Sequence, residues 1–322
     1  MALSLFEHPP MSIQWYPGHM HKAIKEIKEI LPSIDLVIEL LDARLPYSSE
    51  NPVIGSLRGE RPCIKLLNKS DLADPAVTDR WIASLESERG VKAMAVCSNQ
   101  PERIRALPEL CKKLVPRKEG AVGDIQALIM GIPNVGKSTL INLLAGRAVA
   151  KTGNEPAITK GQQRINLHNG ITLIDTPGIL WPKVENEKSG YRLATTGAIK
   201  ETAMSYDDVA LFAADFLIEH YPDLLQTRYK LAKTPLAGME LLEIIGRQRG
   251  CLASRGSIDY DKAARLFLGE LRDGTLGRIT LETPEMATRE REETAQLMAE
   301  IVAEKERKKA ERQKKHSGKR LS

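Results

Sequence analysis

The chain has 322 residues, 42% hydrophobic and 28% charged, a composition typical of a soluble globular protein of about two domains. No apolar run is long enough to span a membrane, and no basic region precedes an apolar one at the N-terminus, so we expect neither a membrane segment nor a signal peptide. Residues 304–322 carry nine Lys or Arg and three Glu, a net +6, so the total of +5 leaves about −1 for the remainder.

The first part of the chain alternates predicted helices and strands. In residues 20–31, Ile24, Ile27 and Ile30 recur at helical spacing with lysines between them. This pattern predicts a helix with one face in the core, and an RNA-facing lysine surface is the alternative. Three apolar runs that end in polar turns predict buried strands, with helix-like stretches after the second and third. The strands lie at 34–44, 63–71 and 91–99, and the helices at 76–90 and 101–115.

Residues 125–178 continue the same alternation. A strand, a glycine-rich turn and a helix are predicted over 125–147, with Gly146 as the C-terminal stop of the helix. Two further strands over 164–178 meet at Asn169-Gly170, a strong hairpin signal. The fold class is therefore α/β, with a sheet covered on both faces.

The pattern changes after about Pro182, where apolar residues recur at helical spacing without strand alternation. We predict three parts: an α/β domain at 1–185, a mainly α-helical domain at 186–285, and a charged segment at 286–322 that begins helical and ends as a disordered basic tail. The four cysteines are far apart and form no CxxC pair, which favours buried thiols in a reducing cytoplasm over a disulfide or zinc framework.

The stretch "GIPNVGKS" (131–138) matches the phosphate-binding pattern GxxxxGK[ST]. Its glycines let backbone N–H groups wrap a phosphate at the positive end of the following helix. Lys137 would reach the β- and γ-phosphates, and the Ser138 hydroxyl would bind Mg²⁺. The alternative is a glycine-containing strand–helix turn without a ligand.

A second motif, "DTPG" (175–178), closes the strand "ITLID". Asp175 at a strand end could hold Mg²⁺ through water, and the Gly178 N–H could meet the γ-phosphate. The same four residues also make an ordinary turn, but their position about forty residues after the glycine-rich loop favours the functional interpretation.

The stretch "NKSD" (68–71) matches NKxD, the guanine-recognition motif of GTP-binding proteins. The Asp71 carboxylate can accept hydrogen bonds from the N1–H and 2-amino group of guanine, while adenine lacks this pair of donors. Lys69 can lie over the base, and Asn68 can brace the loop. The alternative is a strand-to-helix turn with Ser70 or Asp71 as the helix cap.

NKxD normally follows the phosphate-binding loop, whereas here it precedes that loop by about sixty residues. Cutting an ordinary GTPase domain after DTPG and moving the later pieces to the front gives the order of this chain. A domain with neighbouring termini tolerates such a circular permutation. The strand at 34–41 would then be the one that follows DTPG in the unpermuted sheet.

The chain resembles the circularly permuted GTPases, most closely the bacterial ribosome biogenesis GTPase A family, also called RbgA or YlqF. The resemblance covers nearly the whole chain short of the tail. It depends on "WYPGHM", "DARLP" (42–46), "NKSDL", "GIPNVGKSTLIN", "PAITKGQQ" and "DTPGIL". It implies a circularly permuted P-loop GTPase domain followed by the helical domain and the basic tail.

The resemblance also implies the site. The nucleotide-binding residues would be Asn68, Lys69, Asp71, Cys97, Ser98, Asn134, Val135, Gly136, Lys137, Ser138, Thr139, Thr159 and Gly178. Mg²⁺ would be held by Ser138, Thr159 and Asp175, and K⁺ by Asn134. Two positions depart from the family pattern: Ala157 replaces the usual glycine of the switch segment, and 97–99 read Cys-Ser-Asn where Ser-Ala is common.

Ras-type GTPases follow DxxG with a glutamine that orients the attacking water, whereas Ile179 and Leu180 follow DTPG here. Either another group positions the water, or intrinsic hydrolysis is slow. In the resembling family the histidine of "WYPGHM", His19 in this chain, is the proposed catalytic residue. Histidine can donate or accept a proton near neutral pH. The alternative is a histidine that caps the helix starting near Met20, and neighbouring His21 is a weaker candidate.

By resemblance, the protein is a cytoplasmic GTPase that converts GTP to GDP and phosphate during late assembly of the large ribosomal subunit. Its partners would be the large-subunit precursor and its rRNA, without a membrane, and it would act as a monomer. The alternative is a nucleotide-gated RNA-binding module with negligible hydrolysis of its own. The basic tail is either a solvated extension or an rRNA phosphate contact, and the same choice applies to "GRQRG" (246–250) and Arg255.

Overall fold

The computed structural model describes residues 19–117, 123–150, 163–176, 186–199 and 205–318. Six strands form one sheet in the order β3-β2-β1-β4-β6-β5. They are β1 (Leu36–Asp42), β2 (Cys63–Asn68), β3 (Val91–Ala95), β4 (Ile125–Gly131), β5 (Gln163–Asn166) and β6 (Ile171–Asp175). All neighbouring strands are parallel except β5 and β6, which form the antiparallel hairpin predicted at Asn169-Gly170.

The strand order confirms the permuted arrangement. The first strand of the chain lies in the middle of the sheet, between β2 and β4. Its residue Leu40 pairs with Gly131 on one side and with Leu66 on the other. Placing β1–β3 after β6 in the chain restores the usual motif order of a GTPase. In the sheet, β1 then follows on the side of β4 that faces away from β6.

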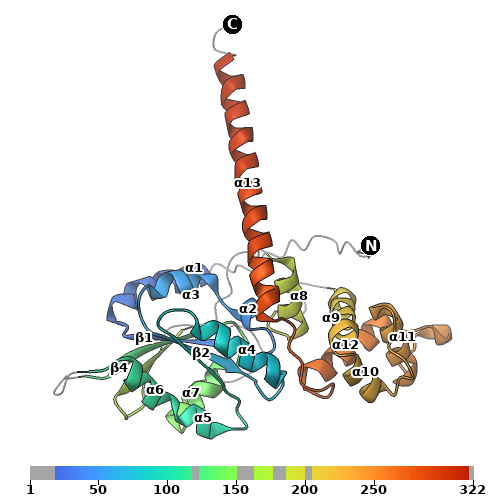
Figure 1. Cartoon of the computed structure of the whole chain (residues 1–322), viewed down its shortest axis with the longest axis horizontal. Helices are drawn as coiled ribbons and strands as arrows, with labels where there is room; N and C mark the ends of the chain where they lie inside the picture. The colour runs from blue at the N-terminus through green and yellow to red at the C-terminus, as the bar shows by residue number, and fades with distance from the viewer. Residues whose placement is uncertain (1–18, 118–122, 151–162, 177–185, 200–204, 319–322) are drawn as a thin grey trace. The chain divides into compact units, whose positions relative to one another are not determined.

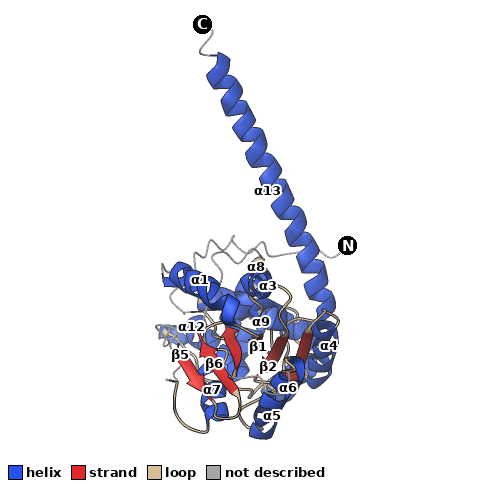
Figure 2. Cartoon of the chain, turned by 90° about the vertical axis from the view of Figure 1, so that its left-hand side faces the viewer, coloured by secondary structure: helices blue, strands red, loops and turns tan. Residues whose placement is uncertain are grey.

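Helices cover both faces of the sheet, as the central position of the strands in Figure 2 shows. On one face, Ile27 of α1 (His19–Ile30) packs against Val37 and Cys63, while Lys25 and Lys28 are exposed. The prediction that one face of this helix packs in the core is thus confirmed. The other face is covered by α5 (Pro101–Arg105), α6 (Leu107–Leu114) and α7 (Lys137–Ala145). Gly146 ends α7 with φ +65°, as predicted.

Three further helices lie between the strands. Two of them, α2 (Pro46–Ser49) and α3 (Pro52–Arg58), follow β1 and were not predicted, since each begins at a proline and is too short to show a helical period. The third, α4 (Pro75–Glu86), begins after Asp74, whose carboxylate accepts from the N–H groups of Ala76 and Val77 at 2.9 and 3.3 Å. Asp74 is therefore the helix cap, and neither Ser70 nor Asp71 has that role.

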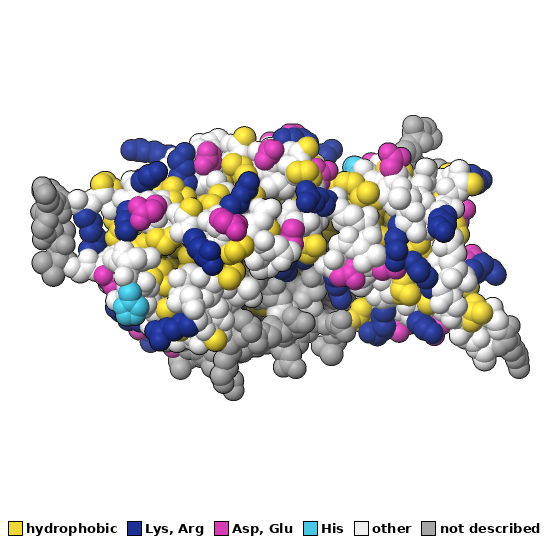
Figure 3. All heavy atoms as spheres, turned by 90° about the horizontal axis from the view of Figure 1, so that it is seen from below, with side chains coloured by type: hydrophobic (Ala, Val, Ile, Leu, Met, Phe, Trp, Pro, Cys, Tyr) yellow, Lys and Arg dark blue, Asp and Glu magenta, His cyan; other side chains and the backbone are white. Residues whose placement is uncertain are grey.

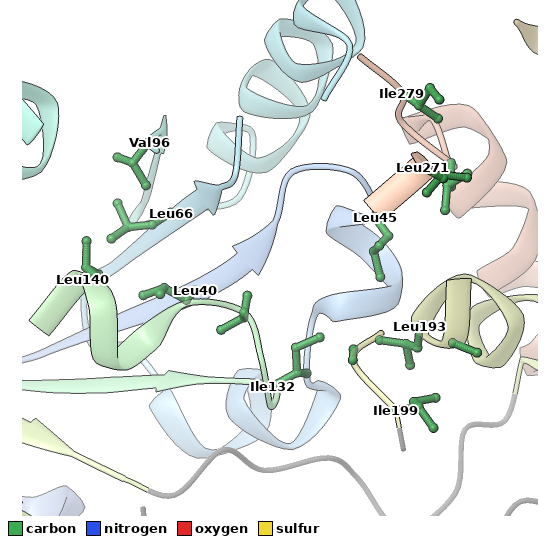
Figure 4. Close-up of a cluster of buried hydrophobic side chains, with 14 of the residues drawn as sticks. Leu40, Leu45, Leu66, Val96, Ile132, Leu140, Leu193, Ile199, Leu271 and Ile279 are labelled. Carbon is green, nitrogen blue, oxygen red and sulfur yellow. The ribbon is translucent and has the colours of Figure 1, made fainter. Parts of the chain in front are cut away.

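The described residues after 186 are mainly helical, as predicted (Figure 1). Its helices are α8 (Glu187–Thr195), α9 (Tyr206–His220), α10 (Pro222–Tyr229), α11 (Gly238–Gln248) and α12 (Tyr260–Arg272). The apolar core of the sheet continues into these helices. Figure 4 shows Leu40 and Leu66 of the sheet in the same cluster as Leu193 and Leu271 of the helices.

A buried polar group also joins the two parts. Glu282, which is fully buried, accepts from the Ser48 N–H at 2.8 Å, the Ser48 hydroxyl at 2.5 Å and Arg192 at 3.2 Å. The backbone oxygen of Glu282 accepts from the indole N–H of Trp81 at 2.9 Å. In agreement with these contacts, Met1–Glu282 form one compact unit.

The second unit, Thr283–Ser322, contains α13 (Pro284–Gly318), so helix runs through most of the basic stretch. Within it Lys308 pairs with Glu304 one turn earlier at 2.6 Å. In the described part of the chain, every helix is too short or too polar to cross a lipid bilayer. The four cysteines are free and buried, as predicted. On the face seen in Figure 3, basic and acidic side chains are interspersed.

Candidate functional site

The predicted motifs meet at the carboxyl edge of the sheet. NKSD continues β2, the glycine-rich loop continues β4, and Asp175 ends β6. Asp42 ends β1 and is paired with Asn68 across the sheet. Ligands of open α/β sheets bind at this edge, because loops from several parallel strands converge there. Residues more than a hundred positions apart in the chain are thereby brought together.

A cavity of about 200 Å³ lies between the two nucleotide motifs. NKSD contributes Asn68, Lys69 and Asp71, and the glycine-rich loop with its helix contributes Gly136 and Thr139. Ser98, from the loop after β3, is also in the wall. The apolar part of the wall comes from Leu72, Ile104, Leu140 and Leu143. A cavity lined by apolar side chains and a carboxylate suits a planar base that carries hydrogen-bond donors.

The glycine-rich loop is braced by NKSD. The side-chain amide of Asn68 donates to the Val135 carbonyl at 2.7 Å. Gly136 has φ +97°, and a Cβ placed on it would lie 2.4 Å from Asn68 Nδ2. Only glycine fits this position, for reasons of both conformation and space. Asn134 also adopts a left-handed backbone, with φ +58°, and its Nδ2 donates to Gly197 O at 3.1 Å.

The NKSD loop is itself held from two sides. Lys69 has φ +59°, a strained conformation for a lysine and one that is typical of functional loops. Its ammonium lies 3.1 Å from Asp42 Oδ2. The Asp71 carboxylate accepts from the side-chain amide of Asn99 at 3.0 Å. The sequence placed Asn99 in the base-backing loop but gave its side chain no role, and it assigned Asp42 no part in the site. Asp42 gave no signal beyond its place in a strand-end motif.

A buried ion pair lies beneath the glycine-rich loop. Lys137, the first residue of α7, donates to Asp175 Oδ1, and both side chains are buried. Burial raises the pKa of the Asp175 carboxyl, even though Lys137 opposes this shift. The second oxygen of Asp175, Oδ2, is buried and has no hydrogen-bond partner among the residues that the structure describes. An unsatisfied carboxylate oxygen of this kind is suited to a water or a cation.

The remaining predicted site residues are placed as follows. Ser138 lies in the first turn of α7, next to Lys137. Cys97 is buried, and the next residue, Ser98, lines the cavity. Thr159 and Gly178 lie outside the described residues, as does the side chain of His19, the first residue of α1.

Comparisons with known proteins agree with this geometry. The family described as "50S ribosome-binding GTPase" matches residues 126–240. The "Ribosome biogenesis GTPase A" of Bacillus cereus is 48% identical over 282 residues, which are 85% of this chain and 95% of that protein. A GDP-bound structure of TM YlqF has a TM-score of 0.59 at 27% identity, covering 81% of this chain and 99% of that one. A GNP-bound YlqF from T. maritima has a TM-score of 0.58 at 28% identity, covering 82% and 99%.

Proposed function

The chain belongs to the ribosome biogenesis GTPase A family, and we propose on this basis that it assists assembly of the large ribosomal subunit. It binds GTP and GDP and hydrolyses GTP to GDP and phosphate. The observation that carries this conclusion is the single cavity wall shared by NKSD, Ser98 and the glycine-rich loop. Since its relatives are named as GTPases, hydrolysis is favoured over an RNA-binding module without turnover.

Within the cavity, Asp71 would accept from the N1–H and 2-amino group of guanine, and Lys69 would lie along the face of the base. Ser98 and the adjoining Cys97 would back the base, mainly through backbone N–H groups. The N–H groups from Asn134 to Thr139 would hold the phosphates at the N-terminus of α7, with Gly178 meeting the γ-phosphate and Lys137 reaching the β- and γ-phosphates.

Magnesium would be held by Ser138 and Asp175, with Thr159 as the expected further ligand. The donors fit, because a hydroxyl and a carboxylate are the oxygen ligands that Mg²⁺ uses with phosphates. The unpartnered Oδ2 of Asp175 is an available acceptor for metal-bound water. Bound there, the ion would neutralise charge on the transferring phosphate. The ion pair between Lys137 and Asp175 supports this assignment, because it joins the glycine-rich loop's lysine to the carboxylate of the other motif.

Potassium should accelerate turnover. Because Nδ2 of Asn134 donates to Gly197 O, its amide oxygen is the atom suited to a monovalent cation. Such a cation would place positive charge beside the phosphates where other GTPases use an arginine. We expect GTP turnover about fivefold faster in KCl than in NaCl at equal ionic strength, an effect on transition-state charge. Equal turnover in the two salts, at equal GTP affinity, would assign Asn134 to loop bracing alone.

The partner would be a precursor of the large subunit, contacted through its rRNA by the proposed helical domain at 186–285. We propose a cytoplasmic protein that acts as a monomer and needs no membrane. The 304–322 segment, with its net charge of +6, would add contacts to rRNA phosphates that depend on charge and not on sequence.

Deleting residues 304–322 should reduce the salt dependence of subunit binding. Each lost phosphate contact lowers the slope of log affinity against log salt by about 0.7–0.9, so we expect a reduction of at least about one. A matched variant with every Lys and Arg of this segment changed to Gln keeps the length and should show the same reduction. An unchanged slope in both variants would make the segment a solvated extension.

Association itself is tested by affinity purification from cells followed by sucrose-gradient sedimentation. With a non-hydrolysable GTP analogue, the protein should sediment with large-subunit particles, and with GDP it should remain near the top of the gradient. Sedimentation with small subunits, or with no particle in either nucleotide state, would contradict the proposed role.

A further inference from the structure

The turn "DAR" at the end of β1 contains a buried carboxylate that the proposed function does not use. Asp42 and Arg44 are each 2% exposed. Arg44 holds both carboxylate oxygens, with Nε 2.9 Å from Oδ1 and Nη2 2.8 Å from Oδ2. The Arg44 backbone N–H donates to the same carboxylate at 3.1 Å. This bidentate ion pair fixes the position of the Asp42 carboxylate.

Arg44 is in turn anchored on both sides. Its Nη1 donates to the carbonyl of Arg272 at 3.4 Å, and its own carbonyl accepts from the Leu281 N–H at 2.7 Å. The same segment of chain also contacts the residue that follows NKSD, since Ile279 N–H donates to Leu72 O at 3.0 Å. The carboxylate of Asp42 is therefore part of a rigid scaffold and not of a mobile surface loop.

Lys69, which lines the cavity, also contacts this carboxylate. The Lys69 ammonium lies 3.1 Å from Asp42 Oδ2, the oxygen that also binds Arg44 Nη2. Asp42 lies opposite Asn68 in the sheet, so the parallel register of β1 and β2 places it beside the motif. Burial disfavours the charged carboxylate, but Arg44 and then Lys69 outweigh this and hold the pKa of Asp42 below its ordinary value. The Asp42 carboxylate is thus charged throughout the physiological pH range.

We propose that Asp42 is a positioning residue for guanine nucleotides: it fixes the Lys69 ammonium so that the lysine stem is already arranged as a wall of the base cavity. This inference deepens the proposed function and depends on it. A free lysine side chain loses rotamer entropy when it is ordered. An ion pair made before binding removes much of this cost from the binding step.

The test measures GDP affinity by titration calorimetry for the full chain and its variants. Asp42→Asn should weaken GDP binding about tenfold, because a charge-assisted contact is lost and Lys69 is released. Lys69→Met should weaken it by a similar factor. In the double variant the two losses should not add, because Asp42 acts through Lys69, and such non-additivity is the signature of a shared pathway.

Two further measurements separate positioning from a general structural role. Asp42→Asn should weaken binding of GDP and of inosine diphosphate by the same factor, because the lysine stem contacts the face of the base and not its edge. Glu270→Gln is the matched control. It neutralises a carboxylate of α12 that, like Asp42, binds two basic side chains, here Arg228 and Arg249. This variant is expected to leave GDP affinity unchanged.

Asp42→Asn leaves Arg44 buried without its partner, which is costly to the fold. The variant Asp42→Asn with Arg44→Gln removes both charges, keeps the interior neutral and still releases Lys69, so it should show the same tenfold loss. Wild-type GDP affinity in either folded variant, or losses that add with Lys69→Met, would overturn the proposal. A wild-type protein that fails to bind GDP would instead overturn the proposed function.

Discussion

Replacing Asp71 with asparagine is expected to weaken GTP binding by about a hundredfold, or roughly 2.7 kcal/mol. The carboxylate lines the cavity and would accept two hydrogen bonds from guanine. An asparagine turns a donor toward a donor, so buried polar groups of the base are left unpaired. Xanthine carries an acceptor where guanine has its 2-amino group. The variant should therefore bind xanthosine triphosphate better than GTP in a titration of both nucleotides.

Asn99→Ala is the control for this change. It removes the 3.0 Å hydrogen bond that orients Asp71 but leaves the carboxylate in place. We expect GTP affinity to fall by about threefold, as for one exposed hydrogen bond, without a gain for xanthosine triphosphate. Equal GTP affinity in Asp71→Asn and wild type would show that NKSD does not recognise the guanine base.

Replacing His19 with alanine should leave GTP affinity within about threefold of wild type, yet reduce subunit-stimulated turnover at least about tenfold, on the order of 1.4 kcal/mol in barrier. Histidine can orient a water near neutral pH, and no glutamine follows DTPG in this chain. His19 begins α1, where a loop movement ordered by the ribosome would bring it to the phosphates.

His21→Ala provides the matched control, because it removes a histidine two residues further along the same helix. Its stimulated turnover should equal that of wild type. The measurement is phosphate release at saturating GTP with purified large subunits. A His19→Ala protein that hydrolyses GTP normally under these conditions would exclude this histidine from the mechanism.

Much of the fold could be predicted from local patterns. The strands around Leu40, Leu66 and Leu128 are mostly apolar, although the first two contain Glu39 and Lys65, and such a pattern is typical of parallel strands buried on both faces. The permuted motif order predicted that NKSD and the glycine-rich loop serve one nucleotide, and residues of both motifs line the same cavity. The short helices α2 and α3 could not be predicted, because fewer than two turns give no period to detect.

The supporting contacts of the site lay beyond sequence reasoning for a different reason. The pairing of Asp42 with Lys69 depends on the register of β1 against β2, which no local pattern specifies. The same holds for Glu282, whose partners Ser48 and Arg192 come from distant helices. A charged residue in a strand or turn is ordinarily interpreted as solvent-exposed. Only the three-dimensional structure reveals that these residues are buried and paired.

We propose that GTP turnover by this GTPase is coupled to the large ribosomal subunit. The decisive measurement is phosphate release from GTP by the purified protein alone, with large subunits, and with small subunits, all in potassium buffer. We predict slow release alone, an increase of at least about tenfold with large subunits, consistent with completion of the site by the partner, and no increase with small subunits. Equal release in all three conditions would contradict the proposed coupling to the large subunit.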